Sequence, residues 1–198
     1  MQTDLEYSAI LTGAPFLFYE FRQVVSLKEQ GLNDMEIKEK VLTENLFQYK
    51  LKSSLKRSLP SLLRRVNELD ETLRKMVLED AMGSGKIINL YAIMKTDRLF
   101  FEFMNEVIRE KFEQNYERLE KKDINLYFVS KAEQDAGVAS WSEQTINKLK
   151  QVFIKILFES GILKDKNTGE IHRPLMNEDL KQHLIDIGDI AYVQAMGE

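Results

Sequence analysis

Apolar residues recur along this chain mostly at intervals of three to five positions, which is the spacing of one face of an α-helix. The first such stripe comprises Phe16, Tyr19, Val24 and Leu27. It predicts a helix over residues 15–30 that Gly31 ends, followed by a second helix over residues 34–43 that Asn33 caps. A third helix, rich in basic residues, is expected to begin near Phe47.

Pro60 interrupts this third helix in the sequence. Proline lacks a backbone N–H and crowds the preceding turn, so we expect the helix to kink or break near Leu59 and to restart beyond it. Arg64 and Arg65 then need not share a face with Lys56.

The second half of the chain continues the helical pattern. Residues 87–95 predict a short buried helix, and a longer one is expected to start at Thr96 or Asp97. The apolar stripe of the longer helix comprises Phe100, Phe103, Val107, Phe112, Tyr116 and Leu119. This stripe predicts the central helix of the core, and residues 123–136 predict another helix.

A further helix is expected to end at Ser160, with Gly161 as its terminator. Ser140 and Glu143 have the spacing of a capping box, so the helix should open there.

The segment after this helix suggests a β-hairpin. Residues 162–164 and 170–173 flank the polar loop 165–169, which contains Asn and Gly, and a short helix is predicted from Asn177. Helix, glycine, hairpin and helix in this order are typical of a winged helix, in which the hairpin is the wing.

The predicted fold is therefore all-α, with a small C-terminal β-hairpin. The order of the first three helices resembles a helix-turn-helix, and the C-terminal region resembles a winged helix. The break around Met82 and Gly83 divides the chain into residues 1–82 and 83–198, which could also form one compact unit.

Composition narrows the function. The chain has 198 residues, 43% of them apolar and 30% charged, which is ordinary for a soluble protein with a real core. It has no cysteine for disulfides or thiol catalysis and only two histidines, His172 and His183. No export signal is evident and no apolar stretch reaches the roughly 20 residues that span a bilayer. We expect a cytoplasmic protein that binds no membrane, metal or cofactor.

Charge is strongly segregated along the chain. Between Lys50 and Arg65 there is no acidic residue, and the segment holds six cations: Lys50, Lys52, Lys56, Arg57, Arg64 and Arg65. The whole chain has a net charge of -4, so without these six positive charges the remainder stands at -10. We name these six residues the basic strip. A basic strip on an acidic protein indicates a polyanionic partner, with nucleic-acid phosphate as the leading candidate.

The neighbours of these cations suggest how they would bind. Ser53 and Ser54 can donate hydrogen bonds to phosphates. No Asn or Gln lies between Tyr49 and Val66 to read adenine, so low sequence specificity is expected. A charged helix face can also be merely solvated, and three acidic residues could neutralise the two last arginines inside the fold: Glu68, Asp70 and Glu71. A thinner second basic patch comprises Lys148, Lys150 and Lys155.

An enzymatic function is not expected. Gly83 to Lys86 resembles the end of a phosphate-binding loop, but Ile87 replaces its magnesium-binding Ser or Thr. Neither histidine has a base, nucleophile or metal-ligand set around it in the predicted elements.

Three segments resemble the BrxA family of bacterial BREX phage-defence systems. They are Leu11-Thr12-Gly13-Ala14-Pro15-Phe16-Leu17, Glu44-Asn45-Leu46-Phe47, and the run from Lys56 to Arg65 that reads KRSLPSLLRR. The resemblance extends over nearly the whole chain. It implies a small, mainly helical, non-catalytic DNA-binding component with a fold related to the antitermination factor NusB, and it carries no active site across.

Two other functions stay open. The basic strip could meet an acidic surface on another BREX protein, which would make this chain an assembly adaptor. The relationship to NusB also leaves RNA as a possible partner.

Overall fold

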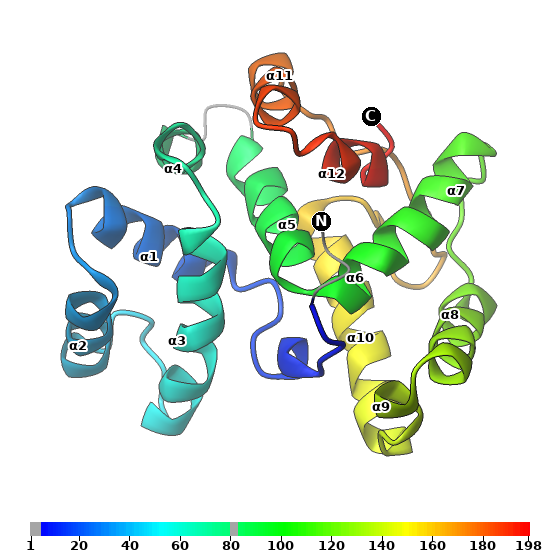
Figure 1. The fold of residues 1–198 in the computed structure, drawn as a ribbon, viewed down its shortest axis with the longest axis horizontal. Coiled ribbons are helices and arrows are strands. Elements are labelled where there is room, and N and C mark those ends of the chain that lie inside the picture. The colour runs from blue at the N-terminus through cyan, green and yellow to red at the C-terminus, as the bar shows by residue number, and fades with distance from the viewer. Residues whose placement is uncertain (1–4, 80–82) are drawn as a thin grey trace.

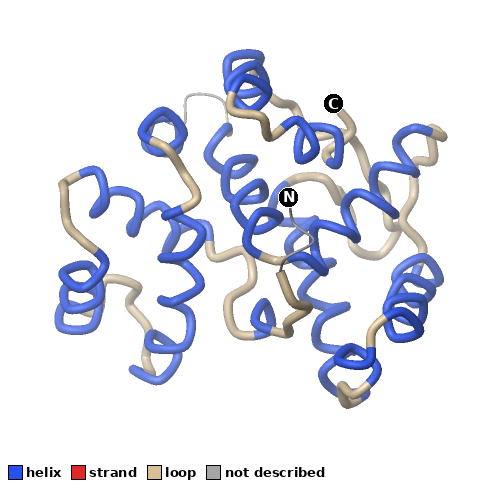
Figure 2. Tube along the Cα trace, viewed as in Figure 1, coloured by secondary structure: helices blue, strands red, loops and turns tan. Residues whose placement is uncertain are grey.

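The computed structural model describes residues 5–79 and 83–198, and this part of the chain is almost entirely helical (Figures 1 and 2). Its helical elements are η2 (Ile10–Thr12), α1 (Phe18–Glu29), α2 (Asp34–Glu44), α3 (Lys52–Asn67), α4 (Glu71–Glu79), α5 (Ser84–Thr96), α6 (Arg98–Phe103), η3 (Met104–Ile108), α7 (Arg109–Glu113), α8 (Lys121–Gln134), α9 (Ala136–Ala139), α10 (Glu143–Ser160), α11 (Glu178–Asp186) and α12 (Ile190–Ala195). The prediction of a mainly helical protein is confirmed. No helix within these residues is long and apolar enough to cross a membrane.

The first two predicted helices are confirmed as α1 and α2. Helix α1 begins three residues after Pro15, at Phe18. The Asn33 side chain accepts hydrogen bonds from the backbone N–H groups of Met35 and Glu36, and the Glu36 carboxylate accepts one from the Asn33 N–H. This reciprocal pair is a capping box, so the start of α2 is fixed by local sequence.

The third helix differs from its prediction in two ways. Asn45 and Gln48 have positive φ angles of 49° and 55°, so the chain turns there and α3 starts only at Lys52. Of the kink or break predicted near Leu59, the break is wrong, because α3 continues through Pro60 to Asn67. Pro60 lies on the exposed side, where water can reach the backbone left without a donor, while Leu59 and Leu62 hold the helix against the core.

Helix α5 is the buried helix that residues 87–95 predict, and every residue from Ile87 to Met94 is buried. It packs against α1, α3 and α4 on one side and against α6, α10 and α12 on the other (Figure 1). One continuous apolar core runs through both halves of the chain. The boundary predicted between residues 82 and 83 adjoins residues 80–82, which lie outside the described part, and the division into two regions stays a prediction.

The predicted long helix forms as α6, η3 and α7, with η3 a π-helical segment. The Asp97 side chain caps it by accepting a hydrogen bond from the Phe100 N–H at 2.8 Å. The helix ends at Glu113, so the last two residues of the predicted stripe, Tyr116 and Leu119, lie beyond it. Its aromatic side chains build the core, with the Phe100 and Phe103 rings 5.0 and 5.3 Å from Phe153 of α10.

Helix α10 ends at Gly161 as predicted, with a φ of 90° that favours glycine. Its start differs from the prediction. The N-cap is Ser142, whose hydroxyl accepts from the Thr145 N–H at 3.2 Å, whereas Ser140 closes the short helix α9. Two serines two positions apart are candidates for this cap, and Ser140 is already the C-cap of the preceding helix α9.

The C-terminal β-hairpin and the winged helix are not confirmed. Among the described residues no strand forms, and only isolated antiparallel bridges join Leu163 to Ile171 and Arg118 to Glu170. The Lys164 N–H donates to the Glu170 carbonyl at 2.8 Å. The chain therefore reverses direction around Asp165 without building a ladder. The short helix predicted from Asn177 is confirmed as α11, with Asn177 as its cap.

Candidate nucleic-acid interface

The exposed side of α3 carries most of the basic strip. At 100° per residue, Lys52, Lys56, Arg57 and Arg64 fall within a 140° arc, and all four are exposed. The opposite arc is buried, with Leu55, Leu59, Leu62 and Val66 in the core. Continuity through Pro60 therefore places Arg64 on the same face as Lys56, about two turns away, which the sequence did not predict. Lys50 is exposed just before the helix begins.

These side chains are not neutralised by the fold. Across residues 5–79 and 83–198, no carboxylate oxygen lies within 4.0 Å of the charged nitrogens of Lys50, Lys52, Lys56, Arg57 or Arg64. We call these five residues the exposed basic strip. Its positive charges are free to meet an anion.

The three acids considered as neutralising partners are engaged elsewhere. Glu68 lies 3.9 Å from Lys95, and Glu71 forms an ion pair with Lys75 at 2.5 Å. Asp70 is paired with His183, whose Nε2 lies 2.6 Å from a carboxylate oxygen. The alternative in which these acids cancel Arg64 and Arg65 is therefore not what the structure contains.

Arg65 does not belong to this surface, which corrects the prediction for that residue. Its side chain is only 1% exposed. The guanidinium donates hydrogen bonds to the backbone carbonyls of Ala14, Pro15 and Phe16, those to Pro15 and Phe16 at 2.8 and 3.3 Å. Arg65 thus ties the segment before α1 to α3 and cannot reach a phosphate outside the protein.

A second polar group is buried near Arg65. Burial raises the pKa of the Asp97 carboxyl to about 6, against hydrogen bonds and the positive charge of Arg65 that act in the opposite direction. Burial also lowers the pKa of the Arg65 guanidinium to about 9, so it stays charged at neutral pH. Asn89 completes the group by donating from Nδ2 to the Phe16 carbonyl at 2.6 Å. Arg65, Asp97 and Asn89 are all buried, so none of them is available to an external ligand.

The two serines of the predicted site differ in their surroundings. Ser53 is exposed on the strip face, whereas Ser54 is half-buried. Ser54 lines a pocket of about 450 Å³ together with Thr12, Gly13, Gln48, Tyr49, Lys50, Leu51, Arg57 and Ser58. Tyr49 donates its hydroxyl to Glu20 at 2.7 Å, and both burial and this bond raise its pKa. Tyr49 is therefore a packing residue in this structure.

Gly13 allows Arg57 to lie against the backbone that follows η2. A Cβ atom at residue 13 would stand 3.1 Å from Cγ and 2.9 Å from Cδ of Arg57, and the second distance is shorter than real Cβ contacts. The apolar stem of Arg57 therefore occupies the space that a larger residue would take, while its charged head remains exposed.

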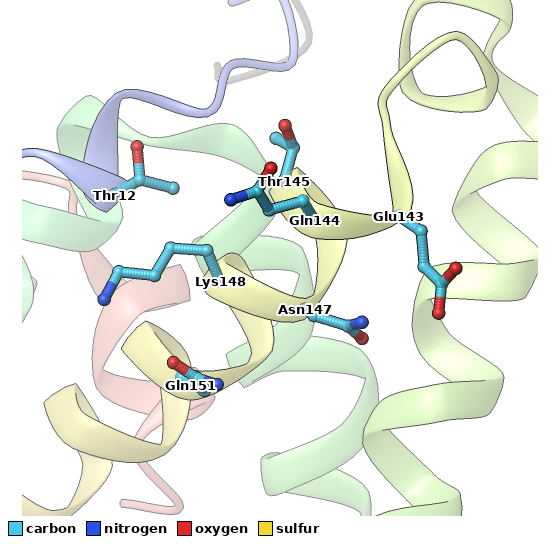
Figure 3. A pocket seen from close by; sticks show the side chains of 7 residues that line it. All are labelled: Thr12, Glu143, Gln144, Thr145, Asn147, Lys148 and Gln151. Carbon is cyan, nitrogen blue, oxygen red and sulfur yellow. The ribbon is translucent and has the colours of Figure 1, made fainter.

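A second polar pocket, of about 840 Å³, lies between η2 and the first half of α10 (Figure 3). It is lined by Thr12, Glu143, Gln144, Thr145, Asn147, Lys148 and Gln151. The basic patch predicted from the sequence includes the lysines of this helix but not its amide side chains. Their spacing of three, four and seven residues was the signal that could have found them.

In the part of the chain that the structure describes, the histidines and acids offer no metal site. Within the described ranges, no group of three His, Cys, Asp or Glu side chains is placed to hold a metal ion. His172 is exposed and His183 is bonded to Asp70.

The fold and the site together define a class of protein: a mainly helical protein with a cationic helix face that no carboxylate neutralises within the described residues. The sequence model of the BrxA family matches residues 5–188, so the chain belongs to the BrxA family. The resemblance of the three segments noted in the sequence is thereby confirmed.

Curated relatives agree with this assignment. The BREX protein BrxA of Bacillus cereus (strain H3081.97) is 44% identical over 197 residues, which cover 99% of this chain and 98% of the relative. The BREX protein BrxA of Escherichia coli O9:H4 (strain HS) is 22% identical and covers 81% and 76%. A crystal structure of an uncharacterized protein from Magnetospirillum magneticum has the same fold, with a TM-score of 0.83 at 20% identity over 97% of this chain and 98% of that one.

Proposed function

We propose that this BrxA-family protein is a non-catalytic DNA-binding component of a BREX phage-defence system. It contacts duplex DNA mainly through phosphates and with low sequence specificity. The observation that carries the proposal is the exposed basic strip, whose five cations have no carboxylate partner among the described residues. Arg64 and Lys56 lie on one helix face with Ser53, which supplies a hydrogen-bond donor about one turn before Lys56.

The dimensions of α3 suit a phosphate backbone. Its 16 residues give a length of roughly 24 Å at 1.5 Å per residue. Duplex DNA carries one phosphate charge per about 1.7 Å of axis, so a face of this length can meet several phosphates and release their counterions. The packing of α1, α2 and α3 on one another is compatible with the helix-turn-helix prediction, in which α3 would lie along the groove. The turn around Asp165 would take the place of the predicted wing.

The proposal is tested by the affinity for a random-sequence duplex near physiological salt, measured by fluorescence anisotropy. The double variant Lys56→Glu, Arg57→Glu should bind at least about tenfold more weakly than the wild type, because it replaces two phosphate contacts by repulsion. A matched control is Lys121→Glu, Lys122→Glu, an adjacent exposed pair on α8 with the same change in net charge. The control should lose much less affinity.

If the two double variants lost equal affinity for duplex DNA, the loss would reflect net charge alone. That result would overturn the assignment of the exposed basic strip as the DNA-binding site. No binding by the wild type would overturn the DNA-binding proposal itself. Circular dichroism and urea unfolding serve as controls that each variant is folded.

An assembly adaptor is the second candidate function. Leu51 stands at the start of the basic strip with 65% of its surface exposed, and an exposed apolar residue beside cations suits an acidic protein partner. A competition assay separates the two candidates. If the protein binds DNA, unlabelled duplex of unrelated sequence should displace a labelled duplex from the strip. If the protein is an adaptor, its protein partner should bind even in the presence of duplex DNA. The same assay with RNA in place of the competitor tests the RNA alternative.

A further inference from the structure

The first half of α10 presents a polar face that the exposed basic strip does not include. Gln144, Asn147, Lys148 and Gln151 are spaced by three, four and seven residues, so they share one face over two turns. All four are exposed. Figure 3 shows Gln144 and Lys148 extending on the side of Thr12, whereas Asn147 and Glu143 point away from Thr12. No acidic residue follows on this helix until Glu159.

These side chains are available to a ligand. Among the described residues, none of the four has a hydrogen bond or an ion pair with another protein side chain. The other two lysines of the helix differ, since Lys150 donates to Asn125 at 2.8 Å and Lys155 lies 3.7 Å from Glu159. The lysine patch predicted on this helix is therefore reduced to Lys148, and the free groups beside it are carboxamides.

The α10 face is continuous with the exposed basic strip. Thr12 lines the pocket at α10 and also the pocket that contains Lys50 and Arg57. The η2 turn packs against α10, and Arg57 packs against Gly13 at the end of η2. In Figure 1 the dark blue η2 turn lies between α3 and α10. A duplex held by the strip would therefore extend toward the amide face.

We infer that Gln144, Asn147 and Gln151 contact adenine edges in the major groove of the duplex that the exposed basic strip holds, with Lys148 on an adjacent phosphate. A carboxamide offers one acceptor and two donors, which match N6 and N7 of adenine. The strip has no such group between Tyr49 and Val66. Recognition helices present base-contacting residues near their N-terminal ends, and these residues lie in the first half of α10. Helix α3 then positions the DNA and α10 supplies a modest A·T preference.

The inference rests on the proposed function, and one experiment separates the two. Affinities are measured for two duplexes of equal length, one of alternating A·T and one of alternating G·C pairs. The wild type should prefer the A·T duplex by at least about fivefold, the lower end of what one bidentate amide contact contributes. Gln144→Ala, Gln151→Ala should lose that preference and keep the salt dependence of the wild type, because no charge is removed.

The matched control is Gln182→Ala, an exposed amide on α11 that should leave the preference unchanged. A wild type that binds both duplexes equally, or a folded double variant that retains the preference, would overturn the inference and leave the DNA-binding proposal standing. A wild type that binds neither duplex would instead overturn the proposed function.

Discussion

Arg64 and Arg65 are neighbours in the chain but serve opposite purposes. The Arg64 side chain is exposed and donates to the Ser61 hydroxyl at 3.3 Å, whereas the Arg65 guanidinium is buried against three backbone carbonyls. A helix turns by 100° per residue, so adjacent side chains can face solvent and core. The same chemical group is therefore a surface charge at Arg64 and a buried hydrogen-bond donor that links two segments of the fold at Arg65.

This contrast gives a prediction on stability. Arg65→Ala should lower the free energy of unfolding by about 3–5 kcal/mol, because it removes the donors of Ala14, Pro15 and Phe16 and leaves Asp97 without its nearby positive charge. Arg64→Ala should change it by less than about 0.5 kcal/mol. Urea unfolding of both variants provides the measurement. Equal free energies of unfolding for the two variants would contradict the stabilising role assigned to the buried hydrogen bonds of Arg65.

Asp97 gives a prediction on pH. Its folded-state pKa of about 6 lies above the ordinary value of 3.8, so protonated Asp97 favours the fold below about pH 4 and this contribution is lost as the pH rises through 6. Asp97→Asn removes the titration and keeps an oxygen to cap Phe100. Relative to the wild type, the variant should gain about 2.5 kcal/mol between pH 4 and pH 7.5. A difference that does not change with pH in urea unfolding would show that Asp97 is not perturbed.

At the scale of the element, α3 is a helix that tolerates a proline because its opposite face is so well packed. Leu55, Leu59, Leu62 and Val66 are all at most 2% exposed. Pro60 therefore costs stability without breaking the helix, and the break expected from local chemistry does not occur. The consequence for function is that the cations from Lys52 to Arg64 lie on one continuous helix.

Pro60→Ala should raise the free energy of unfolding by about 1–3 kcal/mol, because alanine restores the hydrogen bond to the Lys56 carbonyl and has a far higher helix propensity. Urea unfolding with an unchanged m value tests this. A loss of stability would mean instead that the proline geometry is required for the packing of α3.

Some helix boundaries follow from neighbouring residues in the sequence. The starts of α2 and α11 follow from Asn33 and Asn177, whose side chains cap the helix within three residues. Other features do not follow from local sequence. Competition between nearby residues decides the cap at Ser142. Tertiary packing decides the continuity of α3 at Pro60 and the absence of a hairpin ladder. For the site, exposure of five strip cations fits the charge pattern, but burial of Arg65 depends on carbonyls some 50 residues away in sequence.

At the scale of the whole molecule, α5 joins the N-terminal helices to α6, α10 and α12 through one core. This arrangement places the exposed basic strip and the amide face of α10 on either side of η2. The protein has a net charge of -4, yet five cations without a carboxylate partner among the described residues lie together at α3, and Lys148 of α10 lies across η2 from them. Such a distribution favours steering of a polyanion to one face over binding elsewhere.

The salt dependence of duplex-DNA binding tests the central claim most directly. If about five phosphates meet the exposed basic strip, the logarithm of affinity should fall with the logarithm of salt concentration at a slope near -4 to -5. Lys56→Glu, Arg57→Glu should flatten that slope by about two, while Lys121→Glu, Lys122→Glu should leave it close to that of the wild type. A wild-type slope near zero, or a strip variant with the wild-type slope, would contradict the assignment of α3 as the DNA-binding surface.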